Sequence, residues 1–388
     1  MCPLPNTVQT LQVAQPSIGT VSRMPQTTTS PSTTTDVPFQ RLSREMEILG
    51  PNQAGLALGA LWTPILKPVG GYLQKIRLGV ILTGGAGGGA VLSADGPYNV
   101  VQNLFLRDPF GQPVIQADGY SLFLINVYGG QAGMLGFGNL PSTMPSWSAV
   151  TANGNLTFWL DIPFELDSSG YGSLASMNAS SQPQLQIQTN INTVVFSTPP
   201  AGAQPTIEFV ANEEFWAAPV DHPEIAPPDV GSSGQWSVAR AQSTVSSAAF
   251  QRIVLPRVGT WIHTLILVLR DSTNVRIDQW PTSDLTLWVD GVPVVFERFA
   301  ERTDKMFKAF GVTRPTGVIV YTFRDSVQSA VSTADTYDCM LPTTPATLLE
   351  VAGTFGTIAN APATITCITG EVFPVGGIPY THLSGTGA

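Results

Sequence analysis

Short runs of alternating apolar and polar residues fill most of the chain, and Gly, Pro, Asn and Asp separate these runs. A period of two is typical of β-strands joined by tight turns. It predicts strands over residues 72–83, 98–107, 156–164, 184–191 and 206–215. A turn is expected at residues 108–111, because Pro109 presets φ at the second position and Gly111 tolerates the last one.

The second half of the chain carries further signals of β-structure. Residues 261–269 are apolar at nearly every position, which predicts a strand buried on both faces. Residues 285–289 and 292–296 flank an Asp-Gly pair, a strong signal for a two-residue hairpin. Because proline cannot donate a backbone hydrogen bond, Pro293 predicts that the returning strand lies at a sheet edge or contains a bulge.

One segment, residues 296–310, has the period of a helix. Its apolar residues recur at three- and four-residue steps, and they are Phe296, Phe299, Ala300, Met306, Phe307 and Phe310. The ion pairs expected four residues apart are Glu301 with Lys305 and Asp304 with Lys308. Gly311 is placed to end the helix, whose phenylalanines we expect to pack on a sheet.

The chain divides into an arm and two β-rich domains. Residues 1–50 are rich in Thr, Ser, Pro and Gln and cannot bury enough apolar area to offset their ordering entropy, so they predict an N-terminal arm. The arm is expected to be partly extended, with a short helix at residues 41–49. The remaining 338 of the 388 residues exceed one hydrophobic core. They divide into a first domain at 51–218, a Pro- and Gly-rich linker at 219–235 and a second domain at 236–388.

The two halves also echo each other. Residues 157–164 correspond to 317–323, and 185–190 correspond to 348–353. The last strand of the first half is preceded by Gln204-Pro205-Thr206-Ile207, and that of the second half by Ala361-Pro362-Ala363-Thr364-Ile365. The order and rough spacing of these elements agree. Two copies of one β fold in tandem, in an all-β dominated chain with few short helices, account for this pattern.

Composition narrows the function. The net charge is −9 and no basic stripe is present, which argues against direct binding of nucleic acid. Only 12% of residues are charged, as expected of a surface that neighbours cover. The N-terminus does not resemble a secretory signal, so the cysteines, Cys2, Cys339 and Cys367, are interpreted as reduced thiols; a bridge between the last two stays open.

The sequence offers no assembled catalytic, cofactor or metal site. His222, His263 and His382 are too few and too scattered for a triad, and His263 is expected to be a hydrogen-bonded core residue. A glycine-rich run at 84–89 lacks the helix that a dinucleotide site requires and is interpreted as a loop. Glu213 and Glu214 are adjacent on a strand and therefore point to opposite faces.

Three ordered sets of residues resemble the major capsid protein of tectivirus-type bacteriophages. The first is 95–103, followed by 107–109 and the pair Gly119 and Tyr120. The second is 158–164, which leads to Asp167, Gly172 and the pair at 184–185. The third is the helix from Phe296, then 314–318 and the strand that runs to Arg324 and Asp325. Together the three sets cover roughly residues 70–325.

The resemblance implies two tandem eight-stranded jelly rolls without enzymatic activity or cofactor. Three chains are expected to form a pseudo-hexagonal homotrimer that tiles an icosahedral shell over an internal membrane. The implied partners are further copies of the chain, neighbouring capsomers, penton and minor capsid proteins and the internal lipid membrane. The implied location is the virion capsid, after assembly in the host cytoplasm. Arg41 and Arg44, in the arm, are the residues expected to contact the membrane or a neighbouring trimer.

Two alternatives remain at this point. A β-sandwich that binds carbohydrate at a cell surface would also present aromatic residues on β scaffolds, and it predicts a monomer with affinity for glycans. A two-domain β-rich hydrolase would need an acid/base pair, for which Asp161 and Glu165 are the candidates on one strand face or edge.

Overall fold

The computed structural model describes residues 39–85, 90–109, 111, 113–129, 155–165, 172–176, 182–200, 202–221, 225, 235–243, 249–311, 313–323, 340–343, 346 and 348–372. The expectations for residues 1–38, for most of the glycine-rich run and the linker, and for Cys2, Cys339, His222 and His382 lie outside these residues. No helix in the described part of the chain is long and apolar enough to cross a membrane.

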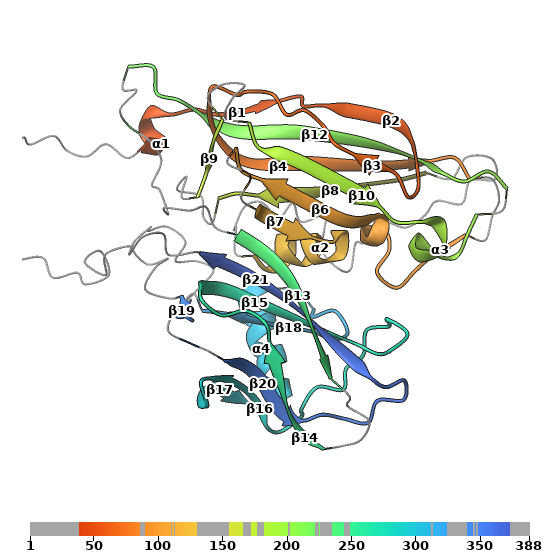
Figure 1. The fold of residues 1–388 in the computed structure, drawn as a ribbon, viewed down its shortest axis with the longest axis vertical. Coiled ribbons are helices and arrows are strands. Elements are labelled where there is room, and N and C mark those ends of the chain that lie inside the picture. The colour runs from red at the N-terminus through yellow and green to blue at the C-terminus, as the bar shows by residue number, and fades with distance from the viewer. Residues whose placement is uncertain are drawn as a thin grey trace, which may run out of the picture. The chain divides into compact units, whose positions relative to one another are not determined.

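The first half of the chain folds into two facing antiparallel sheets (Figure 1). One has the order β1/β2–β12–β4–β8, with bounds Glu45–Ile48, Asn52–Ala57, Thr206–Ala217, Gly71–Thr83 and Asn155–Pro163; β9 (Leu174–Ser176) also pairs with β4. The other has the order β3–β10–β6–β7, with bounds Leu61–Trp62, Gln184–Thr189, Val101–Arg107 and Pro113–Ala117. A small ribbon joins β5 (Val91–Leu92) to β11 (Phe196–Thr198).

The second half repeats this arrangement. Its first sheet has the order β13–β21–β15–β18, with bounds Gln235–Ser243, Ala363–Val372, Trp261–Arg270 and Val318–Thr322; β19 (Leu341–Pro342) also pairs with β15. Its second sheet has the order β14–β20–β16–β17, with bounds Phe250–Leu255, Leu349–Thr354, Leu285–Val289 and Val292–Glu297. Apart from the ribbon of β5 and β11, the described strands of the two halves therefore match one for one.

The helices obey the same repeat. In each half a hairpin, β6–β7 or β16–β17, is followed by a helix that leads to the edge strand β8 or β18; these helices are α2 (Gly119–Tyr128) and α4 (Phe299–Phe310). The described residues also contain three short turns of helix: α1 (Phe39–Leu42), η1 (Tyr98–Val100) and α3 (Asn192–Val195). This topology is an eight-stranded jelly roll present twice, which confirms the expected fold class.

Two apolar cores hold the rolls together. The core of the second roll contains only second-half residues, among them Trp280, Leu287 and Phe355. The core of the first roll extends further, because it also takes in apolar residues of the second half: Ile266, Val268, Met306, Val318, Val320 and Ile368. Each fully buried side chain of this size contributes roughly 1.5–3 kcal/mol. The first core therefore also fastens one roll to the other.

Local signals in the sequence placed the hairpin correctly. Asp290 and Gly291 have φ of 48° and 80°, the left-handed pair that a type I′ turn requires. The register between β16 and β17 shifts next to Trp288, which faces Pro293, and β17 is the last strand of its sheet. The expected turn at 108–111 is also present, closed by the Gly111 N–H donating to the Asp108 carbonyl at 3.0 Å.

The helix predicted from residue 296 begins later. Phe296 belongs to β17, and the helix starts after Arg298, whose N–H donates to Glu301 Oε2 at 3.2 Å. Lys305 pairs with Glu297 at 2.9 Å and not with Glu301, while the expected pair of Asp304 and Lys308 forms at 2.6 Å. Phe296 and Phe307 are 71% and 55% exposed, so the expectation that all phenylalanines pack on the sheet is wrong.

The helix predicted at residues 41–49 is also wrong. α1 ends at Leu42, and Glu45–Ile48 is the strand β1, which pairs antiparallel with β12. A helix of this length is marginal in water, whereas the free edge of β12 offers backbone partners to an extended segment. Two predicted strands are also shorter than expected, since η1 replaces the start of 98–107 and β10 ends at Thr189.

Candidate interface

The carboxylates considered for catalysis have structural partners. Glu213 is fully buried, and its Oε1 accepts the Lys67 backbone N–H at 2.8 Å; burial raises the pKa of Glu213 to about 7. Glu214 lies on the other face, 2.9 Å from Lys75 Nζ. Asp161 shares the same lysine at 3.5 Å, and burial raises the pKa of Asp161. Asp161 and Glu214 form ion pairs with Lys75 that hold neighbouring strands together, whereas Glu213 accepts a backbone N–H.

Glu165 is held in the same way. Its Oε1 accepts Trp216 Nε1 at 2.5 Å and Ser173 Oγ at 3.1 Å, and the residue is buried. The carboxyl thus fastens the segment after β8 to the end of β12. Its interactions differ from those of Asp161, so these contacts give no support to the hydrolase alternative, which would need the two carboxyl groups as an acid/base pair.

His263 and Cys367 are core residues. His263 is fully buried with Nδ1 3.0 Å from Thr264 Oγ1, which confirms the expected hydrogen-bonded core histidine. Cys367 is a buried free thiol whose pKa burial raises to about 12. Within the described ranges, no group of three or more His, Cys, Asp and Glu side chains is placed to hold a metal ion.

Arg41 and Arg44 lie at the start of the described chain. Both are exposed, and the Arg44 carbonyl accepts the Ala217 N–H at 2.8 Å, which ties this segment to the end of β12. Their predicted role as contacts to a membrane or a neighbour stays a prediction.

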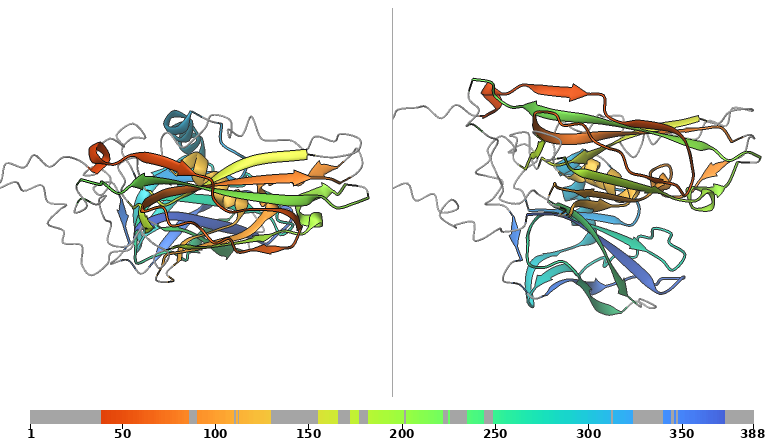
Figure 2. Two further views of the ribbon diagram at one scale, coloured as in Figure 1. Left: turned by 90° about the horizontal axis from the view of Figure 1, so that it is seen from above. Right: turned by 45° about the horizontal axis from the view of Figure 1, so that its top comes forward.

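The main interface within the chain joins the two rolls. β7 and β13 run side by side and parallel, with Ile115 opposite Trp236, so that one sheet of each roll merges into a nine-stranded sheet. Helix α2 lies between the rolls (Figures 1 and 2). Nine of its ten residues are buried, and Tyr128 meets Phe310 of the second roll edge to face at 4.9 Å.

A charged cluster reinforces this join. Asp95 of the first roll accepts Arg270 Nη1 at 2.5 Å and Arg276 Nε at 2.8 Å. Both guanidinium groups also lie over the Tyr120 ring, at 5.4 Å and 4.8 Å from its centre. The three charged side chains are mostly shielded from water, which strengthens their attraction and makes each of them costly to leave unpaired.

Some elements that correspond by the repeat to those of this join carry exposed apolar side chains in the single chain. On β17, Val292 and Phe296 are 64% and 71% exposed, and on α4 Phe307 is 55% exposed. Next to β1, Leu49 is 74% exposed. Low charge predicted covered flanks but not their position. The amphipathic period of 296–310 placed Phe307 on the outer side of the helix. That position would have indicated a covered flank only if the exposed ring had been interpreted as a contact with another molecule.

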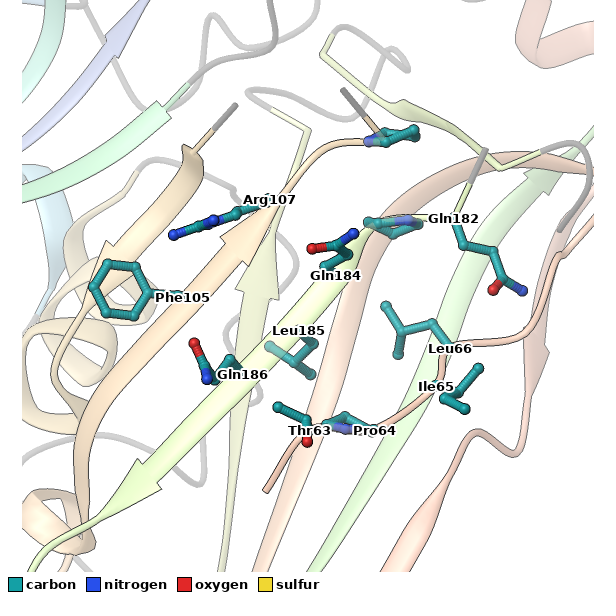
Figure 3. Close-up of a pocket in the computed structure, with 12 residues that line it drawn as sticks. Thr63, Pro64, Ile65, Leu66, Phe105, Arg107, Gln182, Gln184, Leu185 and Gln186 are labelled. Atoms are coloured by element: carbon teal, nitrogen blue, oxygen red, sulfur yellow. The ribbon is translucent and has the colours of Figure 1, made fainter. Parts of the chain in front are cut away.

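A depression lies over β6 and β10 of the first roll (Figure 3). Its volume is about 500 Å³, and it spans β6 and β10, with Phe105 and Arg107 on one strand and Gln184 and Gln186 on the next. An aromatic ring beside amide groups is a surface that a sugar can contact. This depression is the feature of the described structure that supports the carbohydrate-binding alternative.

Comparisons with known proteins identify the fold. No protein-family model and no curated protein matches the sequence. The STIV MCP (Sulfolobus Turreted Icosahedral Virus) is 16% identical, with a TM-score of 0.63 over 88% of this chain and 99% of that chain. The PBCV-1 virus capsid is 13% identical, with a TM-score of 0.59 over 85% and 93%. The major capsid protein P2 from bacteriophage PM2 is 12% identical, with a TM-score of 0.50 over 84% and 98%.

These likenesses define the class of fold to which the chain belongs. It is the double jelly roll of viral major capsid proteins, matched over nearly the full length of each of the three structures. At this level of identity the fold is what they establish. The resemblance found in the sequence and the likeness in structure agree on it.

Proposed function

We propose that the chain is the major capsid protein of a tectivirus-like bacteriophage, a structural protein that is not an enzyme. Three copies form a pseudo-hexagonal homotrimer, and trimers tile an icosahedral shell over an internal membrane. The observation that carries the proposal is the duplicated jelly roll, which matches capsid proteins over 84–88% of this chain.

The surface of the single chain supports assembly. Stable subunit interfaces commonly bury about 1,600 Å² or more, with apolar residues at their centre. Val292, Phe296 and Phe307 are large apolar side chains left in water, as is Leu49 beside β1. Exposed apolar groups of this number suit a protein whose surface is covered by further copies.

The partners follow from this proposal. Neighbouring capsomers, penton and minor capsid proteins would contact the trimer at its rim, and the arm would face the internal membrane. Arg41 and Arg44, in the last part of the arm, are exposed, and each arginine near an anionic bilayer contributes about 1 kcal/mol of attraction. Because β1 belongs to a sheet, the arm is best tested by removing residues 1–37, which spares both arginines.

The oligomeric state tests the proposal directly. Purified protein is expected to have three times the chain mass of 41.2 kDa by light scattering and to show hexagonal outlines in negative stain. Removal of residues 1–37 is expected to leave the trimer intact and to abolish closed shells. A protein that stays monomeric at the concentrations used for assembly would contradict the proposal.

The depression at Phe105 favours one other function, binding of carbohydrate. That function requires a monomer that binds glycans, with binding lost on Phe105→Ala. A glycan array on the wild type and this variant separates the two proposals, since a coat protein is expected to give no such signal.

A further inference from the structure

A cavity of about 610 Å³ lies where the two rolls meet. Residues within 93–102 and 190–197 form its first-roll wall together with the N-terminal end of α2, and Arg270 and residues 273–275 form its second-roll wall. Pockets that bind ligands commonly have volumes of about 300–1,000 Å³. The cavity shares no lining residue with the depression at Phe105 and is therefore a separate feature of the surface.

The cavity and the arm lie at opposite ends of the first roll. At the last residue of β12, Ala217, the N–H donates to the Arg44 carbonyl, so the arm is fastened to this end. β2 pairs with the first residues of β12 and leads to Gly59, whose N–H donates at 3.1 Å to the carbonyl of Asn190 in the cavity wall. Figure 1 shows the same separation, with α1 at one end of the roll and α3 at the other.

Three side chains of the wall keep a polar group that the described contacts do not use. Arg270 makes its side-chain hydrogen bonds through Nη1, which leaves Nη2 as a donor. Asn190 donates through Nδ2 and Asp118 accepts through Oδ1, so that Asn190 Oδ1 and Asp118 Oδ2 remain as acceptors. The wall therefore offers a ligand both donors and acceptors of hydrogen bonds.

The charges at the cavity balance. Its wall contains the carboxylates of Asp95 and Asp118 and the guanidinium of Arg270, and Arg276 reaches the same Asp95 at 2.8 Å. A charged ligand would leave water without gaining a net opposite charge, which costs free energy. A neutral ligand that carries both N–H and C=O groups suits this wall better, and each peptide unit of a polypeptide carries one of each.

The rim of the cavity supplies apolar contacts from both rolls. Val194 of the first roll is 42% exposed, and Val275 of the second is 47% exposed. The ring of Tyr120, the aromatic residue in the described wall, is not open to a sugar, because two arginines lie over it and Phe123 packs beside it at 5.9 Å. Apolar side chains left in water around a polar floor favour a ligand that has apolar side chains of its own.

We propose that this cavity binds an extended, uncharged peptide segment of a partner protein. The apolar side chains of the segment contact Val194 and Val275. One backbone carbonyl accepts from Arg270 Nη2, and backbone N–H groups donate to Asn190 Oδ1 and Asp118 Oδ2. Because the arm is at the other end of the roll, the partner lies on the outer side of the shell; that placement rests on the proposed function, whereas binding to the isolated protein does not.

Binding of defined peptides tests the proposal. The probe is an array of random hexapeptides whose ends are acetylated and amidated, so that they carry no terminal charge. The peptides that the wild type selects are expected to be uncharged and rich in apolar residues. Fluorescence anisotropy of one selected peptide in solution then gives its dissociation constant.

Two matched variants locate the site. Val275→Trp places a large ring at the rim of the cavity and is expected to weaken binding about tenfold or more. Val258→Trp puts the same side chain on a valine that is 40% exposed and precedes β15, whereas Val275 follows it, and is expected to bind as the wild type does. Both valines are exposed, so both variants are expected to fold, which urea unfolding checks.

Asp118→Asn tests the acceptor without breaking the helix. Asparagine caps a helix as well as aspartate does, so α2 is expected to keep its N-cap. The wall then has one positive charge in excess, and the preference on the array is expected to shift toward peptides with one acidic residue. A side chain that only capped the helix would leave this preference unchanged.

The outcomes are distinct from those of the assembly test. If no peptide binds the wild type above background, or if Val275→Trp binds as tightly as Val258→Trp, the proposed peptide site is wrong, and trimers seen by light scattering still support the proposed function. Binding of sugars that Val275→Trp abolishes would replace the peptide with a carbohydrate and also overturn the inference. A monomeric protein that binds the peptide at this cavity would contradict the proposed function and leave the site standing.

Discussion

Helices α2 and α4 occupy the same position in the two jelly rolls and yet have opposite surfaces. All but one of the residues of α2 are buried, whereas in α4 the only buried residue is Met306. Counted from their N-caps, Asp118 and Arg298, the buried Leu124 of α2 corresponds to the exposed Asp304 of α4. The same element of the fold therefore carries a different surface in each roll, according to what lies against it.

The neighbours explain the difference. Both sides of α2 are covered within the folded chain, so its side chains do not have to be compatible with water. α4 is covered on one side only, and its outer face is exposed to water in the single chain; in the proposed assembly a further copy covers it. A permanent contact can be apolar throughout, while a contact made later has to remain compatible with water.

The largest effect is expected when the buried Leu124 of α2 is replaced by aspartate, the residue at the equivalent position of α4. Leu124→Asp places an unpaired carboxylate in a fully buried position, and we expect it to lower the free energy of unfolding by about 4 kcal/mol or more. The reverse change, Asp304→Leu, is expected to alter stability by less than about 0.5 kcal/mol because the site is exposed. Urea unfolding measures both. Equal effects would show that the two helices do not differ in their surroundings.

The charged cluster between the rolls gives the next largest effect. Asp95→Asn leaves Arg270 and Arg276 without their carboxylate in a shielded position, at an expected cost of about 3 kcal/mol. Lys308→Ala, which breaks the exposed pair with Asp304, should cost about 0.5 kcal/mol or less. Thermal unfolding of the two variants, compared with the wild type, checks this; similar shifts would mean that the cluster does not fasten the rolls.

The buried glutamates extend the comparison to the cores of the rolls. The folded pKa of Glu213 is raised from 4.5 to about 7, so its contribution to stability is complete below about pH 4.5 and declines as the pH rises through about 7. Glu213→Gln removes this loss and is expected to raise stability at pH 8 by roughly 2 kcal/mol, with little change at pH 4.5.

Glu371→Gln is the matched variant in the second roll. Because it removes the carboxylate that Arg257 binds, it is expected to lower stability at pH 8. Urea unfolding at the two pH values measures both variants. A loss of stability in Glu213→Gln at pH 8 would contradict the account of its burial.

The smallest effect concerns assembly alone. In the proposed trimer, Phe307→Ser is expected to weaken association about tenfold, roughly 1.4 kcal/mol, because it removes an exposed aromatic side chain that we propose a further copy covers. Stability of the isolated chain should not change, since Phe307 is 55% exposed there. Ile65→Ser, at a still more exposed site on the first roll (82%), serves as the control. Light scattering over a dilution series gives the dissociation constants, and equal values for the two variants would exclude α4 from the interface.

Much of the fold was predictable because the strands and turns depend on residues that are close together in the sequence. Alternation placed β4, β8 and β12, a continuous apolar run placed β15, and the Asp-Gly pair placed the hairpin between β16 and β17. The echo between the halves predicted two copies of one fold, since a repeated pattern of faces and turns folds in the same way twice. The low charge indicated that the surface is meant to be covered.

Other features were decided by parts of the chain that are distant in sequence. Residues 45–48 are a strand because β12 offers them a free edge, and Lys305 pairs with Glu297 because the helix begins later than its period suggests. The join of β7 to β13 and the burial of α2 arise only when the two rolls meet. Periodicity tells which face of an element is apolar, but what covers that face depends on contacts formed between distant segments, and those exist only in the folded protein.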